Sequence, residues 1–499
     1  MPLSAWRLRL LIVSLLTVSF LGALDHTVVS TSLATITGDL GAVEQMSWVI
    51  VSYTLASTVL LPVIGKLADL IGARVVFLAS LALFIVASLF CGLAQDITQL
   101  ALARVAQGIG SAGLHLMPQT IVGDVTTPRE RPKVMAMIGA AFPIAILVGP
   151  LAGGLITDAW GWRWVFWINI PVGLIALALA VVAVPHIAGR SGRRFDIAGA
   201  LVLGVTVTAF VLAAGWVSSE GLQAGIPLII AALVALVGLI VFIAIELRVS
   251  EPVVPLRHFA NRTVLVCLVL STVIGVGLFS VVSYVPTYIQ MAYRTSATVS
   301  GLVPIATVFG MLVSSLLTGW LASRSGRYRI YPVIGTAVAA VGLLIMSQLP
   351  PGMPLWVPMA AMGLVGIGTG AFMNIIVAVA QSAASRSDTG SVTATISLVR
   401  QVGSTTATAI VGGLIGVGVT LGLPATLDAA TLTPAAVNAA SAAVQSDVAA
   451  LYSSVMAPIF LGLAVTYALG VVAALLLPNG RLSDERDAAP LAEAEPAIA

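Results

Sequence analysis

The sequence predicts an all-α polytopic membrane protein, from its composition, its recurring apolar runs and the placement of its basic residues. Of its 499 residues, 59% are hydrophobic and only 9% are charged, whereas a typical soluble domain carries about 25% charged residues. Apolar runs of about 20 residues, enough to cross a hydrocarbon core of about 30 Å, recur along the whole chain. Such runs cross the membrane as helices, because a helix satisfies its own backbone hydrogen bonds in lipid.

Fourteen spans are predicted from the lengths of these runs and from the charged, proline and glycine breaks between them. Their centres lie near residues 20, 56, 84, 110, 145, 175, 206, 236, 275, 308, 340, 366, 404 and 466. All but four of the 23 Lys and Arg residues then fall on one side; Arg163 and Arg294 lie opposite, and Arg104 and Arg400 lie within spans. Because basic loops remain in the cytoplasm, we expect a multi-pass protein of the cell (inner) membrane with both termini cytoplasmic.

The two ends of the chain repeat each other. The stretch "GKLADLIGAR" begins at Gly65 and "GWLASRSGRYR" begins at Gly319, an offset of 254 residues. Internal repeats are typical of transporters, whose sites lie between the halves near the membrane midplane. The predicted parts are a six-helix half (1–190), two linker helices (191–250), a second six-helix half (251–478) with an outer loop at about 418–454, and a disordered cytoplasmic tail (479–499).

Several motifs in order resemble the major facilitator superfamily, in particular its fourteen-helix drug:proton antiporter branch. They are "ALDHTVVSTSLATI" (23–36), "GKLADLIGAR" (65–74), "RVAQGIG" (104–110), "GAAFPIAILVGPLAGG" (139–154) and "WGWRWVFWINIP" (160–171). The resemblance covers the chain to about Pro478. It implies a major-facilitator fold of two six-helix halves with two extra central helices.

The first loop motif is expected to act in conformational switching through Gly65, Asp69, Gly72 and Arg74. The resemblance implies that Asp69 joins a contact between the halves, whose charge pairs break and re-form during transport. The second copy has Ser323 in place of Asp69, which predicts a one-sided contact. The alternative is that the basic residues of this loop only set the topology.

The span-5 motif contributes Gly149, Pro150, Gly153 and Gly154 to the same expected switch. Proline removes a backbone donor and can kink a helix, while glycines let a neighbouring helix approach closely. The resemblance implies a bent, tightly packed helix at the gate. General packing of small residues is the alternative.

Asp25 and Arg104 are the predicted proton-coupling residues. Asp25 is the one acidic residue clearly within a predicted span, ~24 Å along the helix from Arg9 at ~1.5 Å per residue. An isolated carboxyl group in apolar surroundings favours its neutral, protonated form, so Asp25 is expected to take up and release a proton. The resemblance links Arg104 to proton coupling, and a nearby cation would tune the acid. A structural role for Asp25 is the alternative.

Polar side chains on otherwise apolar helices are the candidates for a substrate cavity. The candidates are His115, Gln119, Asn374, Gln381 and Arg400. Hydrogen bonds between helices are an alternative for each of them. Methionines and aromatic side chains among few charges suit varied amphiphilic molecules. Some members of the family that the motifs resemble carry a carboxylate in span 10, and its absence here argues against divalent cations as the preferred cargo.

These observations predict a proton-coupled antiporter that exports diverse lipophilic or cationic drugs by alternating access. A dedicated exporter of one lipid, sugar or antibiotic fits the same motifs, and a non-transporting sensor or scaffold is the hypothesis from another class. No enzyme is expected, because the four histidines are scattered and no phosphate-binding loop GxxxxGK[ST] occurs. The expected partners are drug-like substrates, protons and the bilayer, with no nucleic acid, no cofactor besides the proton motive force, and a monomeric state.

Overall fold

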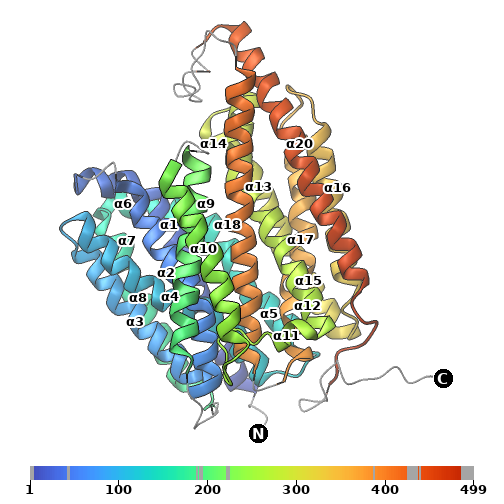
Figure 1. Ribbon diagram of the computed structural model, residues 1–499. Helices are drawn as coiled ribbons and strands as arrows, with labels where there is room; N and C mark the ends of the chain where they lie inside the picture. Colours follow the sequence, from blue (N-terminus) through green and yellow to red (C-terminus); the bar gives the residue numbers. More distant parts are fainter. Residues whose placement is uncertain are drawn as a thin grey trace.

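The computed structural model describes residues 5–41, 45–186, 189, 195–220, 225–385, 388–423, 437 and 440–484. Its described secondary structure is helical (Figure 1). The first half comprises α1 (Ala5–Asp39), α2 (Met46–Ile71), α3 (Ala73–Leu93), α4 (Ile97–Val125), α5 (Arg131–Gly139), α6 (Ala141–Trp160), α7 (Arg163–Trp167) and α8 (Asn169–Ala183). The linker helices are α9 (Ile197–Glu220) and α10 (Gly225–Glu246).

The second half begins with a short helix and a span that contains a π-helical turn. It comprises α11 (Arg257–Ala260), α12 (Arg262–Ile274), η3 (Gly275–Phe279), α13 (Ser280–Tyr293), α14 (Ala297–Ser300), α15 (Leu302–Ser325), α16 (Ile330–Gln348), α17 (Trp356–Ala383), α18 (Thr389–Gly422) and α20 (Ala442–Leu475). Together α12, η3 and α13 form one span from Arg262 to Tyr293.

The predicted set of spans is confirmed. Thirteen described helical segments are long and apolar enough to cross a membrane. The fourteenth is α4, which is 29 residues long but is less apolar than the others, because it includes Arg104, Gln107, His115 and Gln119. Helix α4 therefore has a lower mean hydropathy because it carries polar side chains into the bundle.

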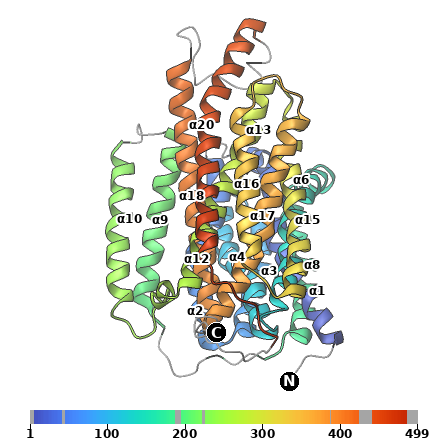
Figure 2. The ribbon, with the colours of Figure 1, turned by 90° about the vertical axis from the view of Figure 1, so that its right-hand side faces the viewer.

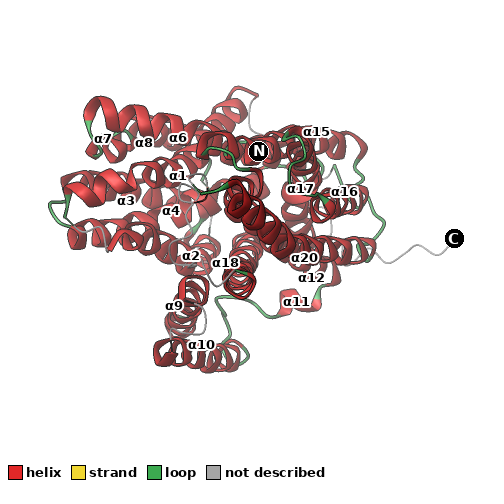
Figure 3. Ribbon diagram, turned by 90° about the horizontal axis from the view of Figure 1, so that it is seen from above, coloured by secondary structure: helices red, strands yellow, loops and turns green. Residues whose placement is uncertain are grey.

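The two halves stand side by side, and the linker helices lie outside them (Figures 1 and 3). Helix α9 packs against α2 of the first half and α18 of the second, so the linker pair borders both halves. Helix α1 begins and α20 ends at the same end of the bundle (Figures 1 and 2). We call this end the base and the opposite end the top.

The expected outer loop is largely helical where the structure describes it. Helix α18 continues to Gly422 and α20 begins at Ala442, so both project beyond their neighbours at the top (Figure 2). The alanine-rich start of α20 has a high helix propensity, and the Ser441 side chain caps it by accepting from Val444 N. Residues 424–436, 438 and 439 of the predicted loop lie outside the described residues.

The first residues of the expected disordered tail, 479–484, are instead packed against the base. Leu482 is buried, and its N–H donates to the Gly326 carbonyl over 2.8 Å. Arg129 N donates to Ser483 O, and the Arg129 guanidinium pairs with Asp484. These contacts hold residues 479–484 against the base: the Leu482 side chain is buried there, and Ser483 O and the Asp484 carboxylate accept from Arg129. Residues 485–499 lie outside the described part.

The repeat is visible in the backbone of the two related loops. Gly72 joins α2 to α3 with φ 98°, and Gly326, one repeat offset later in the sequence, joins α15 to α16 with φ 71°. Positive φ is costly for residues with a Cβ atom, which accounts for glycine at both positions.

Candidate functional site

Asp25 lies in the interior of the first half, at the centre of a dense hydrogen-bond network. Its side chain is 0% exposed, and its Oδ2 accepts from Arg104 Nη1 of α4 over 2.7 Å. Its Oδ1 accepts from Gln107 Nε2 over 2.8 Å and from Asn169 Nδ2 of α8 over 2.7 Å. Both carboxylate oxygens therefore have close donors from two other helices.

Arg104 is held as tightly as its partner. Its Nε donates to the Val49 carbonyl of α2 over 3.2 Å, and Nη1 also donates to Gln107 Oε1 over 2.6 Å. The guanidinium carbon lies 4.0 Å from the centre of the Tyr53 ring, a geometry in which the ring face stabilises a cation. Hydrogen bonds and the aromatic face replace the water that a membrane interior does not offer.

The prediction of an isolated carboxyl group is wrong for this conformation. Asp25 and Arg104 form a buried ion pair, so the first half carries balanced charges at this depth. That these two residues act together in proton coupling stays a prediction. Their direct contact means that a change in one acts on the other without an intermediary. Removing one member of such a buried pair leaves the other as an uncompensated buried charge.

Three partners in this network, Gln107, Asn169 and Tyr53, were not predicted from the sequence. Gln107 follows Arg104 by three residues, so it lies on the same helix face, and that spacing could have revealed it. Asn169 is an amide in an apolar span, a type of residue that seldom lacks a partner. Tyr53 carried no signal of its own, since aromatic residues are frequent in membrane spans.

Asp69 connects the two halves at the base. Its Oδ1 accepts from Gly390 N over 2.8 Å, its Oδ2 accepts from Ser391 N over 2.9 Å, and the Ser391 hydroxyl donates to Oδ2 as well. Both amides belong to the first turn of α18, where N–H groups have no partner within the helix and the helix dipole favours a negative charge. The expected charge pair is wrong: Asp69 binds peptide N–H and hydroxyl donors rather than a cation.

Gly65 lets α2 and α18 approach at this contact. A Cβ atom at Gly65 would lie 2.7 Å from the Gly390 carbonyl oxygen and 2.5 Å from the Ala394 Cβ. Gly72 shapes the loop, as described above. Arg74, by contrast, donates to the Val181 carbonyl of α8, within its own half, so the structure places it apart from the contact between the halves.

The second copy of the motif makes a related contact with different chemistry. A Cβ atom at Gly319 of α15 would lie 2.7 Å from the Pro132 carbonyl oxygen and 2.5 Å from the Ala136 Cβ of α5. Ser323 is the residue equivalent to Asp69 in the second copy, and its backbone carbonyl accepts from Arg129 Nε over 3.0 Å. The base is thus closed by two glycine-mediated helix crossings, and the acid is present in only one of them.

Further ion pairs surround the first crossing. Lys66 Nζ binds Glu251 Oε2 over 2.7 Å, which ties the loop motif to the segment after α10. Arg257 Nη2 binds Asp388 Oδ2 over 2.9 Å, next to the first turn of α18. Burial by itself would raise the pKa of Asp388, but hydrogen bonds from Ser385 and Arg257 outweigh burial and lower it. Asp388 therefore stays charged at neutral pH and keeps its pair with Arg257.

The glycines of α6 pack against the helix that carries Asp25. A Cβ atom at Gly149 would lie 2.0 Å from Thr27 Oγ1, and one at Gly153 would lie 2.9 Å from the Val28 carbonyl oxygen. Pro150 is exposed, and Gly154 has nothing within 4 Å of its Cβ position. Only two of the four residues thus mediate close packing, and that packing lies within the first half.

The candidate cavity residues separate into two groups. Gln381 is buried and donates to the Gln119 carbonyl over 3.1 Å and to Thr393 Oγ1 over 2.8 Å, so this amide joins the halves. Asn374 donates to Ser315 Oγ of the neighbouring α15 over 2.7 Å. His115 and Arg400 instead make no side-chain hydrogen bond or ion pair with the described residues.

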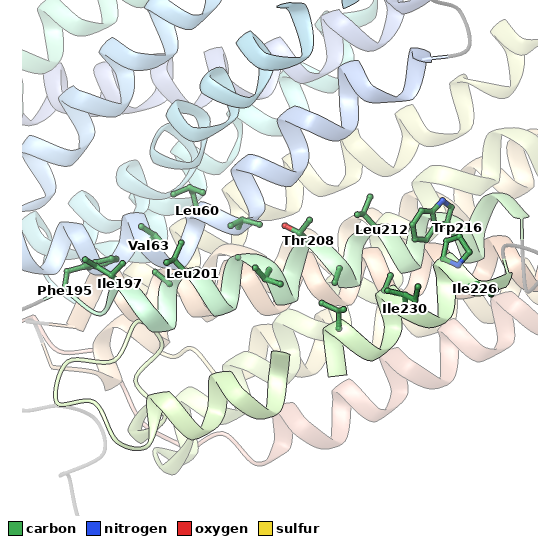
Figure 4. A pocket seen from close by; sticks show the side chains of 18 residues that line it. Leu60, Val63, Phe195, Ile197, Leu201, Thr208, Leu212, Trp216, Ile226 and Ile230 are labelled. Carbon is green, nitrogen blue, oxygen red and sulfur yellow. The ribbon is translucent and has the colours of Figure 1, made fainter. Parts of the chain in front are cut away.

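An apolar groove of about 900 Å³ lies beside the linker helices (Figure 4). Its lining includes Val59, Leu201, Leu212 and Ile230, with Thr208 and Trp216 among its few polar groups. The groove has no charged lining residue, so it cannot respond to protonation or select a charged cargo. The ion pair of Asp25 and the buried charge of Arg400 are the better candidates for coupling and recognition.

We expect that Asp69→Ala slows any cycle that requires closure of the base, by about tenfold or more. The change removes the acceptor for three donors of α18, and a hydrogen bond to a charged group contributes ~1.5–3 kcal/mol. The measurement is initial transport rate in proteoliposomes. The repeat-related Ser323→Ala is the control and should keep the wild-type rate, because its contact uses the backbone carbonyl. An equal loss in both variants would contradict a special role for the acid.

Comparison with known proteins adds independent findings. A family model described as Major Facilitator Superfamily matches residues 15–408. The chain is 33% identical to the uncharacterized MFS-type transporter Rv1877 of Mycobacterium tuberculosis, over 97% of this chain and 72% of the relative. It is also 33% identical to the multidrug transporter protein MdtP of Bacillus subtilis, over 81% of this chain and 75% of the relative.

Solved structures share the fold at low sequence identity. The human organic anion transporter MFSD10 aligns with a TM-score of 0.62 at 13% identity, over 93% of this chain and 99% of that chain. The proton:xylose symporter XylE aligns with a TM-score of 0.60 at 13% identity, over 96% of this chain and 98% of that chain. At this identity the likeness concerns the arrangement of helices.

Proposed function

Since this chain belongs to the major facilitator superfamily, whose members here are multi-pass membrane transporters and not enzymes, we propose that it is a proton-coupled antiporter exporting diverse lipophilic drugs by alternating access. The observation that carries the proposal is the buried pair of Asp25 and Arg104. The likeness to MdtP, named as a multidrug transporter, supports the drug-like cargo. We propose a monomer that uses the proton motive force and no cofactor.

Protonation of Asp25 is the proposed driving step. A proton on the carboxylate removes the negative charge beside Arg104 and leaves a buried cation without a counter-ion. Such a stranded charge costs ~3–5 kcal/mol when it cannot rearrange. The protonated state therefore favours a conformation in which Arg104 finds another partner or water.

Helix α2 offers a direct route from this event to the base. The Val49 carbonyl near one end of α2 accepts from Arg104, and Gly65 and Asp69 near its other end contact α18. A shift of Arg104 thus bears on the helix that closes the base. In this proposal α2 has two positions, one with the base closed and one with it open. The pair of Asp25 and Arg104 and the contact of Asp69 with α18 each favour one of them.

The orientation is part of the proposal. The helix ends and loops at the base carry Lys66, Arg129, Arg257 and Arg324, and basic residues at the ends of spans favour the cytoplasmic side. We therefore place the base and both termini in the cytoplasm and the protein in the cell (inner) membrane. With its base closed, this conformation would receive protons from outside, and the exposed His26 and Ser30 on α1 suit a water-filled entrance.

The test is export of a lipophilic dye from proteoliposomes that contain the purified protein. A proton gradient should accelerate dye movement against its concentration gradient, and proton flux should accompany the dye. Dye movement that ignores an imposed pH difference would contradict proton coupling. A panel of dyes and drugs with one accepted compound would instead support a dedicated exporter, while binding without movement would support a sensor or scaffold.

The expectation of cationic cargo loses its main support in this conformation. It depended on an acid left alone in the membrane, whereas Asp25 accepts from Arg104, Gln107 and Asn169. A cation would have to displace Arg104 to reach the carboxylate. The charge preference of the cargo must therefore be sought at other residues.

A further inference from the structure

Arg400 is a buried cation to which the described part of the chain supplies no partner. It lies in α18, eleven residues after Thr389 at the base, or ~16 Å at ~1.5 Å per residue. Its exposed fraction is 7%, and its guanidinium makes no hydrogen bond or ion pair with any described residue. A guanidinium in the middle of a membrane span normally pairs with an acid or a carbonyl, because lipid offers it nothing.

The surroundings of Arg400 contain further unused polar groups. His115 of α4 lies ten residues from the base end of its helix, which is a similar depth. The His115 side chain is exposed and makes no hydrogen bond with the described residues. Ser397, one turn of α18 below Arg400, has a buried hydroxyl for which the described residues offer no partner.

Arg400, His115 and Ser397 lie above the contact by which Gln381 joins the two halves. Gln381 bonds to Gln119, one turn of α4 below His115, and to Thr393, two turns of α18 below Arg400. His115 and Arg400 thus come from opposite halves and lie at a similar depth, just above the closed base. Substrate sites of transporters built from repeats lie at this depth, between the halves.

An apolar surface accompanies the cation. Phe142 of α6 and Phe279 of η3 come from opposite halves, and their ring centres are 6.3 Å apart. The π-helical turn that contains Phe279 packs against α18, where a Cβ atom at Gly275 would lie 2.2 Å from the Arg400 carbonyl oxygen. The two rings therefore place apolar surface between the halves, on a π-helical turn that packs against α18.

We propose that Arg400, together with His115 of the other half, binds an acidic group of the cargo, so that the exported compounds are amphiphilic anions. A carboxylate, sulfonate or phosphate on an apolar body matches a planar guanidinium, which can donate two parallel hydrogen bonds to such groups. A neutral His115 can donate one N–H, and Ser397 can donate its hydroxyl. This inference rests on the proposed export function and specifies the charge of its cargo.

Charge balance favours an anion over a cation. Asp25 and Arg104 neutralise each other, so Arg400 leaves a positive charge near the middle of the described spans. A cationic cargo there would meet like charge in a medium of low dielectric constant, whereas an anionic one would supply the missing counter-ion. The energetic cost of burying Arg400 alone is thereby relieved when cargo is bound.

The experiment compares three fluorescent probes that share one apolar body. Binding of 9-anthracenecarboxylate, its neutral carboxamide and the cationic 9-(aminomethyl)anthracene is measured on the purified full chain in detergent at pH 7. The wild type should bind the carboxylate about tenfold or more tightly than the carboxamide, as expected for a hydrogen-bonded charge pair. Arg400→Gln should abolish this preference, Arg400→Lys should keep part of it, and the exposed Arg248→Gln should match the wild type.

Thermal unfolding distinguishes recognition from a structural role. Without probe, Arg400→Gln should be at least as stable as the wild type, because it removes a buried charge that no described residue balances. A less stable or unfolded Arg400→Gln would show that the arginine holds the fold, and would overturn the proposal. So would a wild type that binds the carboxamide or the amine as well as the carboxylate, or that binds none of the probes.

The outcomes also separate this inference from the proposed function. Proton-driven dye export without carboxylate preference would overturn the anion site and leave the exporter standing. Carboxylate preference that depends on Arg400, without any response of transport to pH, would overturn proton coupling and leave the anion site standing.

Discussion

Asp25→Asn is expected to abolish pH-driven exchange in proteoliposomes and to lower the thermal stability of the purified protein. Asparagine cannot exchange a proton in the working range, so the proposed driving step is lost. It also replaces one of the two carboxylate oxygens, which accept from Arg104, Gln107 and Asn169, with an NH2 group that cannot accept. The unpaired Arg104 is then buried, and breaking a buried pair in this way costs ~3–5 kcal/mol.

A double variant separates the two effects. Asp25→Asn combined with Arg104→Gln removes both charges, so most of the lost stability should return. Exchange driven by pH should remain absent, while downhill movement of dye should persist if the halves still alternate. Pairwise coupling of this kind is measured by a double-mutant cycle. A double variant that regains pH-driven exchange would show that the pair serves the structure and that the proton binds elsewhere.

The sequence predicted the members of this site better than their arrangement. An acid and a base in apolar spans are visible in any sequence, because each is costly in lipid. Their contact was not, since Asp25 and Arg104 are 79 residues apart and lie on different helices. The third and fourth partners, Gln107 and Asn169, depend on how α4 and α8 pack around α1, which apolar helices do not encode in their periodicity.

The base was predictable for another reason. An internal repeat shows two related loops, and glycine at equivalent positions indicates either a turn or a close approach. Both occur: Gly72 and Gly326 form turns, while Gly65 and Gly319 form helix crossings. The chemistry at the crossing was not predictable, because Asp69 accepts chiefly from backbone groups of α18, and backbone groups leave no trace in the sequence.

Arg400 shows a third case, in which the residue was predicted from the sequence but its significance was not. A polar residue within a span is most often satisfied by a neighbouring helix, and Gln381 and Asn374 follow that expectation. Arg400 departs from it, and only the packed structure reveals that its guanidinium lacks a described partner. Whether a buried charge has a counter-ion depends on how all the helices pack, so the sequence alone does not show it.

Gly65→Ala should hold the base apart and slow transport by about tenfold or more. The added methyl group would lie 2.7 Å from the Gly390 carbonyl oxygen and 2.5 Å from the Ala394 Cβ, so α2 and α18 must separate. Overpacking of this kind costs ~1–3 kcal/mol. That cost applies only to the closed base, and the population shifts toward the state in which the base is open.

Gly154→Ala is the matched control, because nothing lies within 4 Å of the Cβ position of Gly154. Both glycines lie inside long helices, so both variants gain the same helix propensity of ~1 kcal/mol. Only the first of them obstructs a contact between the halves. Gly154→Ala should therefore keep the wild-type transport rate and base separation.

Spin labels across the base measure the separation directly. Val75→Cys in α3 and Ile330→Cys in α16 introduce exposed thiols near the base on opposite halves, while the native Cys91 and Cys267 are buried. Gly65→Ala should move the distance distribution between the labels to longer values, and Gly154→Ala should leave it unchanged. If Gly65→Ala slowed transport with the label distance unchanged, closure of the base would not be the step that Gly65 serves. If the label distance grew while transport kept its rate, the crossing of α2 and α18 at Gly65 would not limit the cycle. The proposed coupling of Arg104 to the base through α2 would then be wrong.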